Sequence, residues 1–225
     1  MKLYLDTANP AEWQASPGLP TLQGVTTNPS LILKAGFPVN LATYLHLIQE
    51  AGRKRLPEIM LQLPRPDPEE AKDWLNALLP AAAEAKTRLI VKLPCRDDWS
   101  ETLEAVQRYG VPLLLTGPSN PLQLLWARAK GAQYLAPYLG RIENSGRDAL
   151  ALARACVALQ RDGTQLVAAS IKTQELLTEL LAMGAYAVTL NPDFVAGLAR
   201  DPLTDAAILQ FEADTRASQS HPAPR

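Results

Sequence analysis

Short apolar runs alternate with longer amphipathic segments along the whole chain. This alternation is typical of repeated β-strand and α-helix units around a parallel sheet. Each run has about five or six residues, the usual length of a strand. The runs occupy 2–6, 22–26, 58–63, 88–93, 111–116, 133–138, 165–170 and 185–190. Because eight strands close a (β/α)8 barrel, the pattern predicts an α/β protein built as a single TIM barrel.

Pairs of Asn or Asp followed by Pro mark the starts of several amphipathic segments. The Asx side chain can accept hydrogen bonds from free backbone N–H groups, and Pro fits the first helical position at little cost. Glu12 and Glu70 stand where a capping box takes an acid. The pairs begin at Asn9, Asn28, Asp67, Asn120, Asn191 and Asp201.

An open, doubly wound sheet would show the same alternation, and periodicity alone does not exclude it. The number of runs favours closure, and LDTANP follows the first run where a Gly-rich phosphate loop would otherwise stand. No Gly/Ser-rich linker divides the chain. We therefore expect one barrel domain, 1–217, with an additional C-terminal helix at 203–217, and a flexible tail at 218–225.

Charge and composition exclude several classes of partner. A net charge of -1 and a pI near 6.2 leave no positive excess for a nucleic acid or an anionic membrane surface. No apolar run is long enough for a signal peptide or a transmembrane helix, so a cytoplasmic protein is expected. Cys95 and Cys156 lack CxxC spacing, which favours reduced thiols. His46 and His221 stand apart from any cluster with ligand spacing, so no metal is expected.

Polar residues at the ends of the apolar runs are the candidates for chemistry, because TIM barrels place their reacting groups at the C-terminal ends of strands. Each of them, taken alone, has a structural alternative as a helix cap or as a polar side chain with satisfied hydrogen bonds. The candidates are Asp6, Thr26, Asn28, Gln62, Lys92, Thr116, Tyr138, Ser170 and Lys172.

Lys92 carries the sharpest signal. It interrupts an apolar run, LIVKLP, that has no acid beside it. Burial there would disfavour the ammonium form and leave an amine that can attack a carbonyl, with the resulting iminium serving as an electron sink. The alternative is a lysine that extends from the strand end into water.

Ser170 and Lys172 follow the seventh run, in a region where TIM barrels often bind phosphate. Arg141 follows the sixth run and can add a bidentate contact. The alternative for Ser170, Lys172 and Arg141 is that they are solvated polar or charged side chains on the rim of the barrel, with no ligand.

Several segments together make the sequence similar to the small transaldolase family, and within it to the fructose-6-phosphate aldolase branch. These segments are LYLDTAN, GVTTNPSLI, IVKLP, YLAPYLGRI and AASIKT, in the order of the family. The resemblance implies a class I mechanism without a cofactor, in which Lys92 forms the Schiff base and Asp6 hydrogen-bonds a substrate hydroxyl. It also implies that Thr26 and Asn28 line the donor site, and that Arg141 and Ser170 hold the acceptor phosphate.

Three positions bear on the branch. Transaldolases typically have Glu, Asn and Phe where this chain has Gln62, Leu114 and Tyr138. In the aldolase branch a tyrosine, with glutamine and threonine, holds a catalytic water, and Tyr138, Gln62 and Thr116 match those residues. Lys172 stands where many transaldolases have Arg, which keeps the charge and loses the bidentate geometry. The segment 116–120 resembles neither branch.

The resemblance therefore predicts reversible aldol cleavage of a ketose phosphate such as fructose 6-phosphate. The alternatives are a transaldolase, which moves the dihydroxyacetone unit between sugar phosphates, and a barrel that binds phosphosugars without catalysis. The expected partners are small sugar phosphates, ketones and aldehydes. The resemblance further implies a homo-oligomer, a pentamer or decamer, with the C-terminal helix packed on a neighbour; the same helix could instead cover the base of its own barrel.

Overall fold

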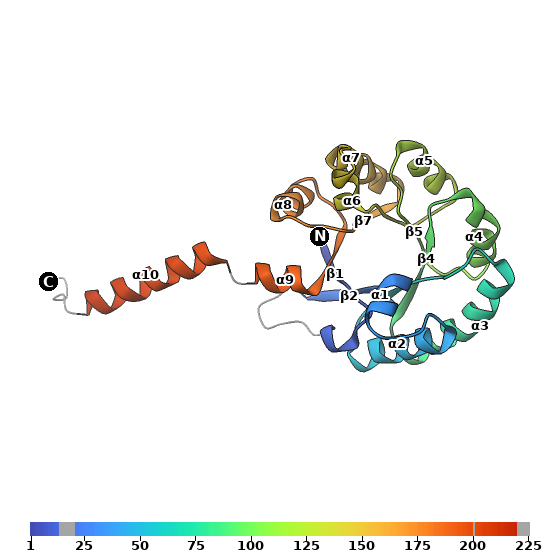
Figure 1. Ribbon diagram of the computed structural model, residues 1–225, viewed down its shortest axis with the longest axis horizontal. Coiled ribbons are helices and arrows are strands. Elements are labelled where there is room, and N and C mark those ends of the chain that lie inside the picture. The colour runs from blue at the N-terminus through green and yellow to red at the C-terminus, as the bar shows by residue number, and fades with distance from the viewer. Residues whose placement is uncertain (14–20, 200, 220–225) are drawn as a thin grey trace. The chain divides into compact units, whose positions relative to one another are not determined.

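A computed structural model describes residues 1–13, 21–199 and 201–219, and its eight strands close into a parallel barrel. Each strand pairs with the next in sequence, and β1 pairs with β8. Figure 1 looks down this ring, with the larger helices outside it. The predicted (β/α)8 fold is confirmed, and the open sheet is excluded. The strands are β1 (Lys2–Asp6), β2 (Leu22–Thr26), β3 (Glu58–Gln62), β4 (Arg88–Pro94), β5 (Leu113–Thr116), β6 (Tyr134–Ala136), β7 (Gln165–Ala168) and β8 (Ala187–Leu190).

Prolines account for two strands that are shorter than the sequence predicts. β5 begins only at Leu113, because Pro112 has no N–H to donate to the ladder. Pro112 still accepts a hydrogen bond from the backbone N–H of Val91 at 2.9 Å. Similarly, β6 ends at Ala136, before Pro137.

Four of the predicted Asx-Pro pairs cap α-helices. The side chains of Asn28, Asp67, Asn120 and Asp201 accept N–H groups of the turns that follow them. Asn9 caps only a three-residue 3-10 helix, η1 (Pro10–Glu12). The α-helices of the barrel unit are α1 (Pro29–Lys34), α2 (Leu41–Arg53), α3 (Pro68–Glu84), α4 (Ser100–Gln107), α5 (Pro121–Ala129), α6 (Leu139–Asn144), α7 (Ala149–Leu159) and α8 (Gln174–Ala182), with 3-10 turns η2 (Asp97–Trp99) and η3 (Gln160–Asp162).

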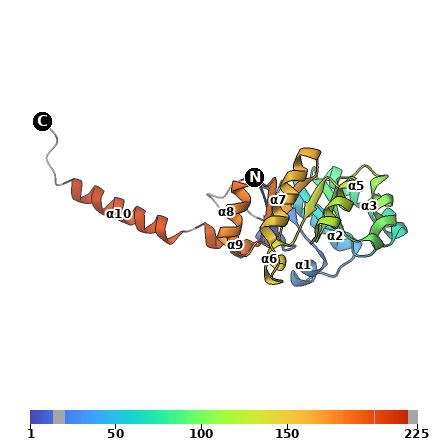
Figure 2. The same ribbon diagram turned by 90° about the horizontal axis from the view of Figure 1, so that it is seen from above.

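The short helices α1 and α6 follow β2 and β6, and Figure 2 shows both at the same end of the barrel. This is the end at which the parallel strands finish. Its rim is therefore built partly from helical turns, whereas the opposite rim holds the starts of the strands.

The barrel interior is filled by a cluster of buried side chains from seven of the strands. Tyr4, Met60, Ile90 and Leu114 each expose none of their surface. Because side chains alternate along a strand, residues two positions further on point to the same interior. The remaining members of the cluster are Tyr134, Ala136, Val167 and Ala187.

A polar cluster closes the end of the barrel where the strands begin. Glu58, at the start of β3, is buried and accepts hydrogen bonds from the Tyr4 phenol and, at 3.3 Å, from Arg88. Arg88 also contacts the Tyr134 hydroxyl at 3.4 Å. Burial is the main cause that raises the pKa of the Tyr4 phenol far above its ordinary value.

The chain divides into two compact units, Met1–Pro192 and Asp193–Arg225. The second unit carries most of α9 (Pro192–Leu198) and all of α10 (Pro202–Ser218), which accounts for the predicted helix at 203–217. Of the predicted tail at 218–225, residues 220–225 lie outside the described part of the chain, as does His221. Among the described residues, none of the helices combines the length and hydropathy needed to span a bilayer.

Candidate active site

Five of the predicted site residues share one position in the barrel. Asp6, Gln62, Lys92, Thr116 and Tyr138 each lie two residues after a member of the interior cluster. They therefore point toward the same axis and form the next layer, at the end where the strands finish. Along the barrel axis, the layer of apolar side chains is therefore followed by a layer of polar side chains at the end where the strands finish.

Lys92 is buried in this layer, with 4% of its surface exposed. Its Nζ donates to the backbone oxygen of Thr27 at 2.7 Å, and Gln62 and Leu114 are its register partners on the neighbouring strands. The alternative of a lysine that reaches out into water is wrong. Burial lowers the pKa of Lys92 to about 8, and the negative charge of Asp6 partly opposes this shift.

Asp6 belongs to a second set of contacts, which joins the neighbouring strands β8, β1 and β2. The hydroxyl of Thr26 donates to Asp6 Oδ1 at 2.7 Å and lies 2.6 Å from the hydroxyl of Thr189 on β8. Because Asn9 caps η1, Asp6 is not the helix cap that the sequence also allowed. Our sequence criteria missed Thr189, although it lies two residues after Ala187 and so follows the same spacing rule.

Tyr138 and Thr116 form a third set. The Thr116 hydroxyl donates to the Tyr138 hydroxyl at 2.8 Å, and the guanidinium carbon of Arg141 lies 4.6 Å from the centre of the Tyr138 ring. Tyr138 was predicted to end a strand. It instead precedes α6 as its N-cap residue and pairs with Ala169 through an isolated parallel bridge.

Gln62 ends β3 next to Lys92 in the register. Its backbone oxygen accepts the phenol of Tyr44 at 2.6 Å, and Tyr44 lies on α2 and packs edge-on against Trp74 of α3. Two helices outside the barrel therefore hold the end of β3. This contact fixes the backbone from which the Gln62 side chain projects.

Ser170 and Lys172 lie beside the first turn of α6. The backbone N–H of Gly140 donates to Ser170 O at 3.0 Å, and Ser170 has a left-handed backbone with φ of 62°. A Cβ on Gly140 would lie 2.2 Å from Ser170 O and 2.9 Å from Lys172 Cγ, so only Gly fits this close approach. Arg141 is the next residue, which brings the two predicted phosphate-binding segments together.

Asn28 caps α1, because its Oδ1 accepts the N–H of Leu31 at 3.1 Å. The structural alternative named for Asn28 is therefore correct. The same amide also carries two N–H donors, so the cap leaves its Nδ2 group available for a further contact.

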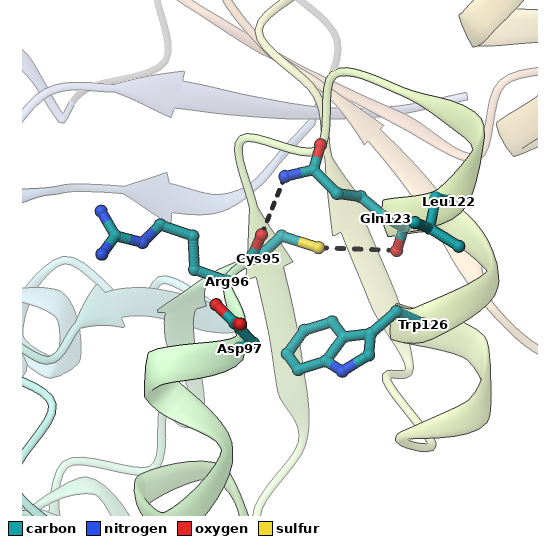
Figure 3. A pocket seen from close by; sticks show the side chains of 6 residues that line it. All are labelled: Cys95, Arg96, Asp97, Leu122, Gln123 and Trp126. Atoms are coloured by element: carbon teal, nitrogen blue, oxygen red, sulfur yellow. Dashed lines mark hydrogen bonds between the residues drawn. The ribbon is translucent and has the colours of Figure 1, made fainter.

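The segment 116–120, which resembles neither branch of the family, leads from β5 into α5. Asn120 caps α5, and the side chain of Gln123 accepts the N–H of Ser119 at 2.7 Å. Gln123 Nε2 also donates to Cys95 O at 3.0 Å, and Cys95 Sγ lies 3.6 Å from Gln123 O (Figure 3). These contacts connect the end of β4, the strand of Lys92, to α5.

A surface pocket of about 350 Å³ lies against this junction (Figure 3). Trp126 and Leu122 of α5 form its apolar wall, and none of the predicted site residues lines it. Cys95 and Cys156 are both buried free thiols, and burial raises their pKa to about 11 and about 12. Within 1–13, 21–199 and 201–219, no group of three or more His, Cys, Asp or Glu side chains is arranged to hold a metal ion.

Comparison with known proteins agrees with the resemblance seen in the sequence. The profile of the family described as Transaldolase/Fructose-6-phosphate aldolase matches residues 67–223. The chain belongs to this family. This membership shows that the protein has an activity of the aldolase or transaldolase type.

Relatives within the transaldolase family match almost the whole chain. A probable transaldolase from Bacillus cereus is 30% identical over 224 residues, which is 97% of this chain and 99% of the relative. A probable transaldolase from Exiguobacterium sp. is also 30% identical, over 98% of this chain and 100% of its own. A designed, cube-shaped protein cage is similar in fold alone, with 15% identity, a TM-score of 0.53 and coverage of 97% of this chain and 77% of that one.

Proposed function

We propose that the protein is a class I aldolase that reversibly cleaves a ketose phosphate such as fructose 6-phosphate into dihydroxyacetone and glyceraldehyde 3-phosphate. The observation that carries this proposal is the buried Lys92 amine, whose pKa is lowered to about 8. At pH 7 about one such amine in ten is uncharged. A neutral amine can attack a ketone carbonyl, whereas an ammonium group cannot.

In the proposed reaction Lys92 Nζ adds to the C2 carbonyl, and loss of water gives an iminium. The C4 hydroxyl loses its proton, the C3–C4 bond breaks, and its electron pair moves into the iminium to give an enamine and the aldehyde. The enamine takes a proton at C3, and water then hydrolyses the iminium to release dihydroxyacetone and the free amine. No step needs a metal or an organic cofactor.

Asp6 and Tyr138 are the groups proposed to move protons. Asp6 is held by Thr26, and Tyr138 is held by Thr116, so both face the mouth on fixed side chains. Gln62 can hydrogen-bond a water but cannot exchange a proton as a glutamate would. We therefore propose that Tyr138, Gln62 and Thr116 hold the water that takes part in proton transfer.

This arrangement supports an aldolase over a transaldolase. Leu114, at the position where transaldolases typically have Asn, is fully buried within the interior cluster, so no amide faces Lys92 from β5. Thr26 and Asn28 are proposed to line the donor site. Arg141, Ser170 and Lys172 are proposed to hold the phosphate of the acceptor.

The decisive test is reduction with borohydride in the presence of dihydroxyacetone, followed by peptide mass mapping. An adduct at Lys92, absent from Lys92→Arg, is expected. If the protein binds a phosphosugar but forms no adduct at Lys92, it is a non-catalytic binding barrel and the proposal fails. Lys130, the partly exposed C-cap residue of α5 that forms an ion pair with Glu104, serves as an internal control that should remain unlabelled.

Transaldolase activity is the second candidate, and the name shared by the curated relatives favours it. Incubation with fructose 6-phosphate alone separates the two activities. Free dihydroxyacetone is the product of an aldolase. If three-carbon transfer appears only when an aldose phosphate acceptor is added, the protein is a transaldolase.

We also propose that α10 joins copies of the chain into a pentamer or decamer. Along this helix Leu203, Leu209 and Phe211 are 83%, 64% and 66% exposed, an unusual exposure for large apolar side chains. Native mass spectrometry of the full chain tests this. Phe211→Asp should lower the oligomer size, whereas Gln210→Asp on the same helix should not.

A further inference from the structure

Tyr138 is held at its hydroxyl by Thr116, at the backbone beside it and along one edge of its ring. The residues on both sides of Tyr138 are hydrogen-bonded to Ala169. The oxygen of Ala169 accepts the N–H of Leu139 at 2.9 Å, and its N–H donates to Pro137 O at 3.1 Å. Gly117 lies against one edge of the ring, since a Cβ there would be 3.5 Å from Tyr138 Cε2. The ring is therefore a fixed surface at the mouth of the barrel.

Arg141 lies over this surface. Its guanidinium carbon is 4.6 Å from the ring centre, and its backbone N–H donates to Tyr138 O at 3.0 Å. A cation over an aromatic face is attracted by the quadrupole of the ring. The Arg141 side chain is otherwise exposed, so the ring restricts a group that would have many orientations in water.

We propose that Tyr138 has a second role as a positioning residue, in which its ring orients the Arg141 guanidinium for the phosphate of the acceptor. This inference rests on the phosphate subsite named under the proposed function. The two parts of the Tyr138 side chain then have different roles. The hydroxyl takes part in proton transfer, and the face of the ring orients Arg141, which binds the phosphate.

The identity of Lys172 makes the orientation of Arg141 more important. A lysine at this position offers a point charge, whereas an arginine presents a planar fork that fits two phosphate oxygens. Of the two cations proposed for the phosphate, only Arg141 can make a bidentate contact. Its affinity for phosphate therefore depends on how well the fork is oriented before the ligand binds.

Binding of glycerol 3-phosphate by the full chain, measured by isothermal titration calorimetry at constant ionic strength, tests the inference. This phosphomonoester has no carbonyl, so the readout needs neither Lys92 nor any aldol chemistry. Tyr138→Phe keeps the ring and should bind within about twofold of the wild type, while Tyr138→Leu should bind about fivefold more weakly, the factor expected for a lost cation–π contact. Circular dichroism and thermal unfolding of both variants report whether the fold is kept.

A double-mutant cycle identifies the route of the effect. Arg141→Ala should weaken binding less in the Tyr138→Leu background than in the wild type, because the fork has already lost its support. Lys172→Ala should weaken binding by the same factor in both backgrounds. Equal affinity of a folded Tyr138→Leu variant and the wild type would overturn the inference, as would absence of glycerol 3-phosphate binding by the wild type. Either result leaves the borohydride test at Lys92 unaffected.

Discussion

The pKa of Lys92 determines how imine formation should depend on pH. Burial lowers this pKa to about 8, and the Asp6 carboxylate raises it in part. We expect the rate of borohydride trapping to rise as the pH increases, with a midpoint near pH 8, because the neutral amine is the nucleophile. Asp6→Asn removes the opposing charge and should move the midpoint to lower pH. A midpoint near the ordinary lysine value of 10.5 would contradict the burial of the amine.

Burial of the charged Lys92 amine should also lower the free energy of unfolding of the protein. Above pH 10.5 the amine is neutral in both the folded and the unfolded chain, so it carries no penalty. Between pH 10.5 and about 8 the unfolded chain takes up a proton first, and stability falls as the pH is lowered. Below about pH 8 the penalty is complete, and it amounts to roughly 3 kcal/mol, since each pKa unit corresponds to about 1.4 kcal/mol.

Lys92→Met should therefore stabilise the protein at pH 7 while abolishing the trapping reaction. The expected gain in the free energy of unfolding is about 2 kcal/mol, because the Thr27 carbonyl loses a donor and offsets about 1 kcal/mol. Urea unfolding at pH 7 measures this gain, and the gain should disappear above pH 10.5. A loss of stability at pH 7 would show that the lysine is not buried at a cost.

At the level of elements, the first turn of α6 links the proposed phosphate ligands. Gly140→Ala would place a methyl group 2.2 Å from the backbone oxygen of Ser170, so α6 and the segment after β7 must separate. We expect a loss of about 1–3 kcal/mol in the free energy of unfolding and weaker binding of glycerol 3-phosphate. Gly197→Ala in α9, where a Cβ meets nothing within 4 Å, is the matched control.

Thermal unfolding and calorimetric titration of the two glycine variants check this prediction. The control should keep wild-type affinity and be neutral or slightly more stable, because Ala is the better helix former. If Gly140→Ala bound glycerol 3-phosphate as tightly as the wild type, the close approach to Ser170 would not be what positions the phosphate ligands.

At the scale of the whole molecule, the number and order of the strands followed from the local periodicity of the sequence. Their closure into a barrel was predicted from the count of eight runs and from LDTANP standing where a Gly-rich loop would otherwise follow the first run. The strand-end rule also located Lys92, Thr116 and Tyr138 in one layer. It missed Thr189, which is followed by Leu190 at the apolar end of the run 185–190. The stacking of Arg141 on Tyr138 and the left-handed Ser170 were not predictable, since both depend on tertiary placement that periodicity does not encode.

The polar cluster at the opposite end of the barrel should stabilise the closed ring and leave the chemistry unchanged. Glu58 is buried and joins β3 to β1 through Tyr4 and to β4 through Arg88. Glu58→Leu removes the acceptor, leaves the Tyr4 phenol buried without it, and should cost about 3 kcal/mol in the free energy of unfolding. In the Tyr4→Phe background the phenol is already absent, so the same substitution should cost less, and urea unfolding of the four proteins measures the difference. Trapping at Lys92 should stay at its wild-type rate below the unfolding transition. Additive costs would show that the two side chains do not stabilise the barrel as a unit.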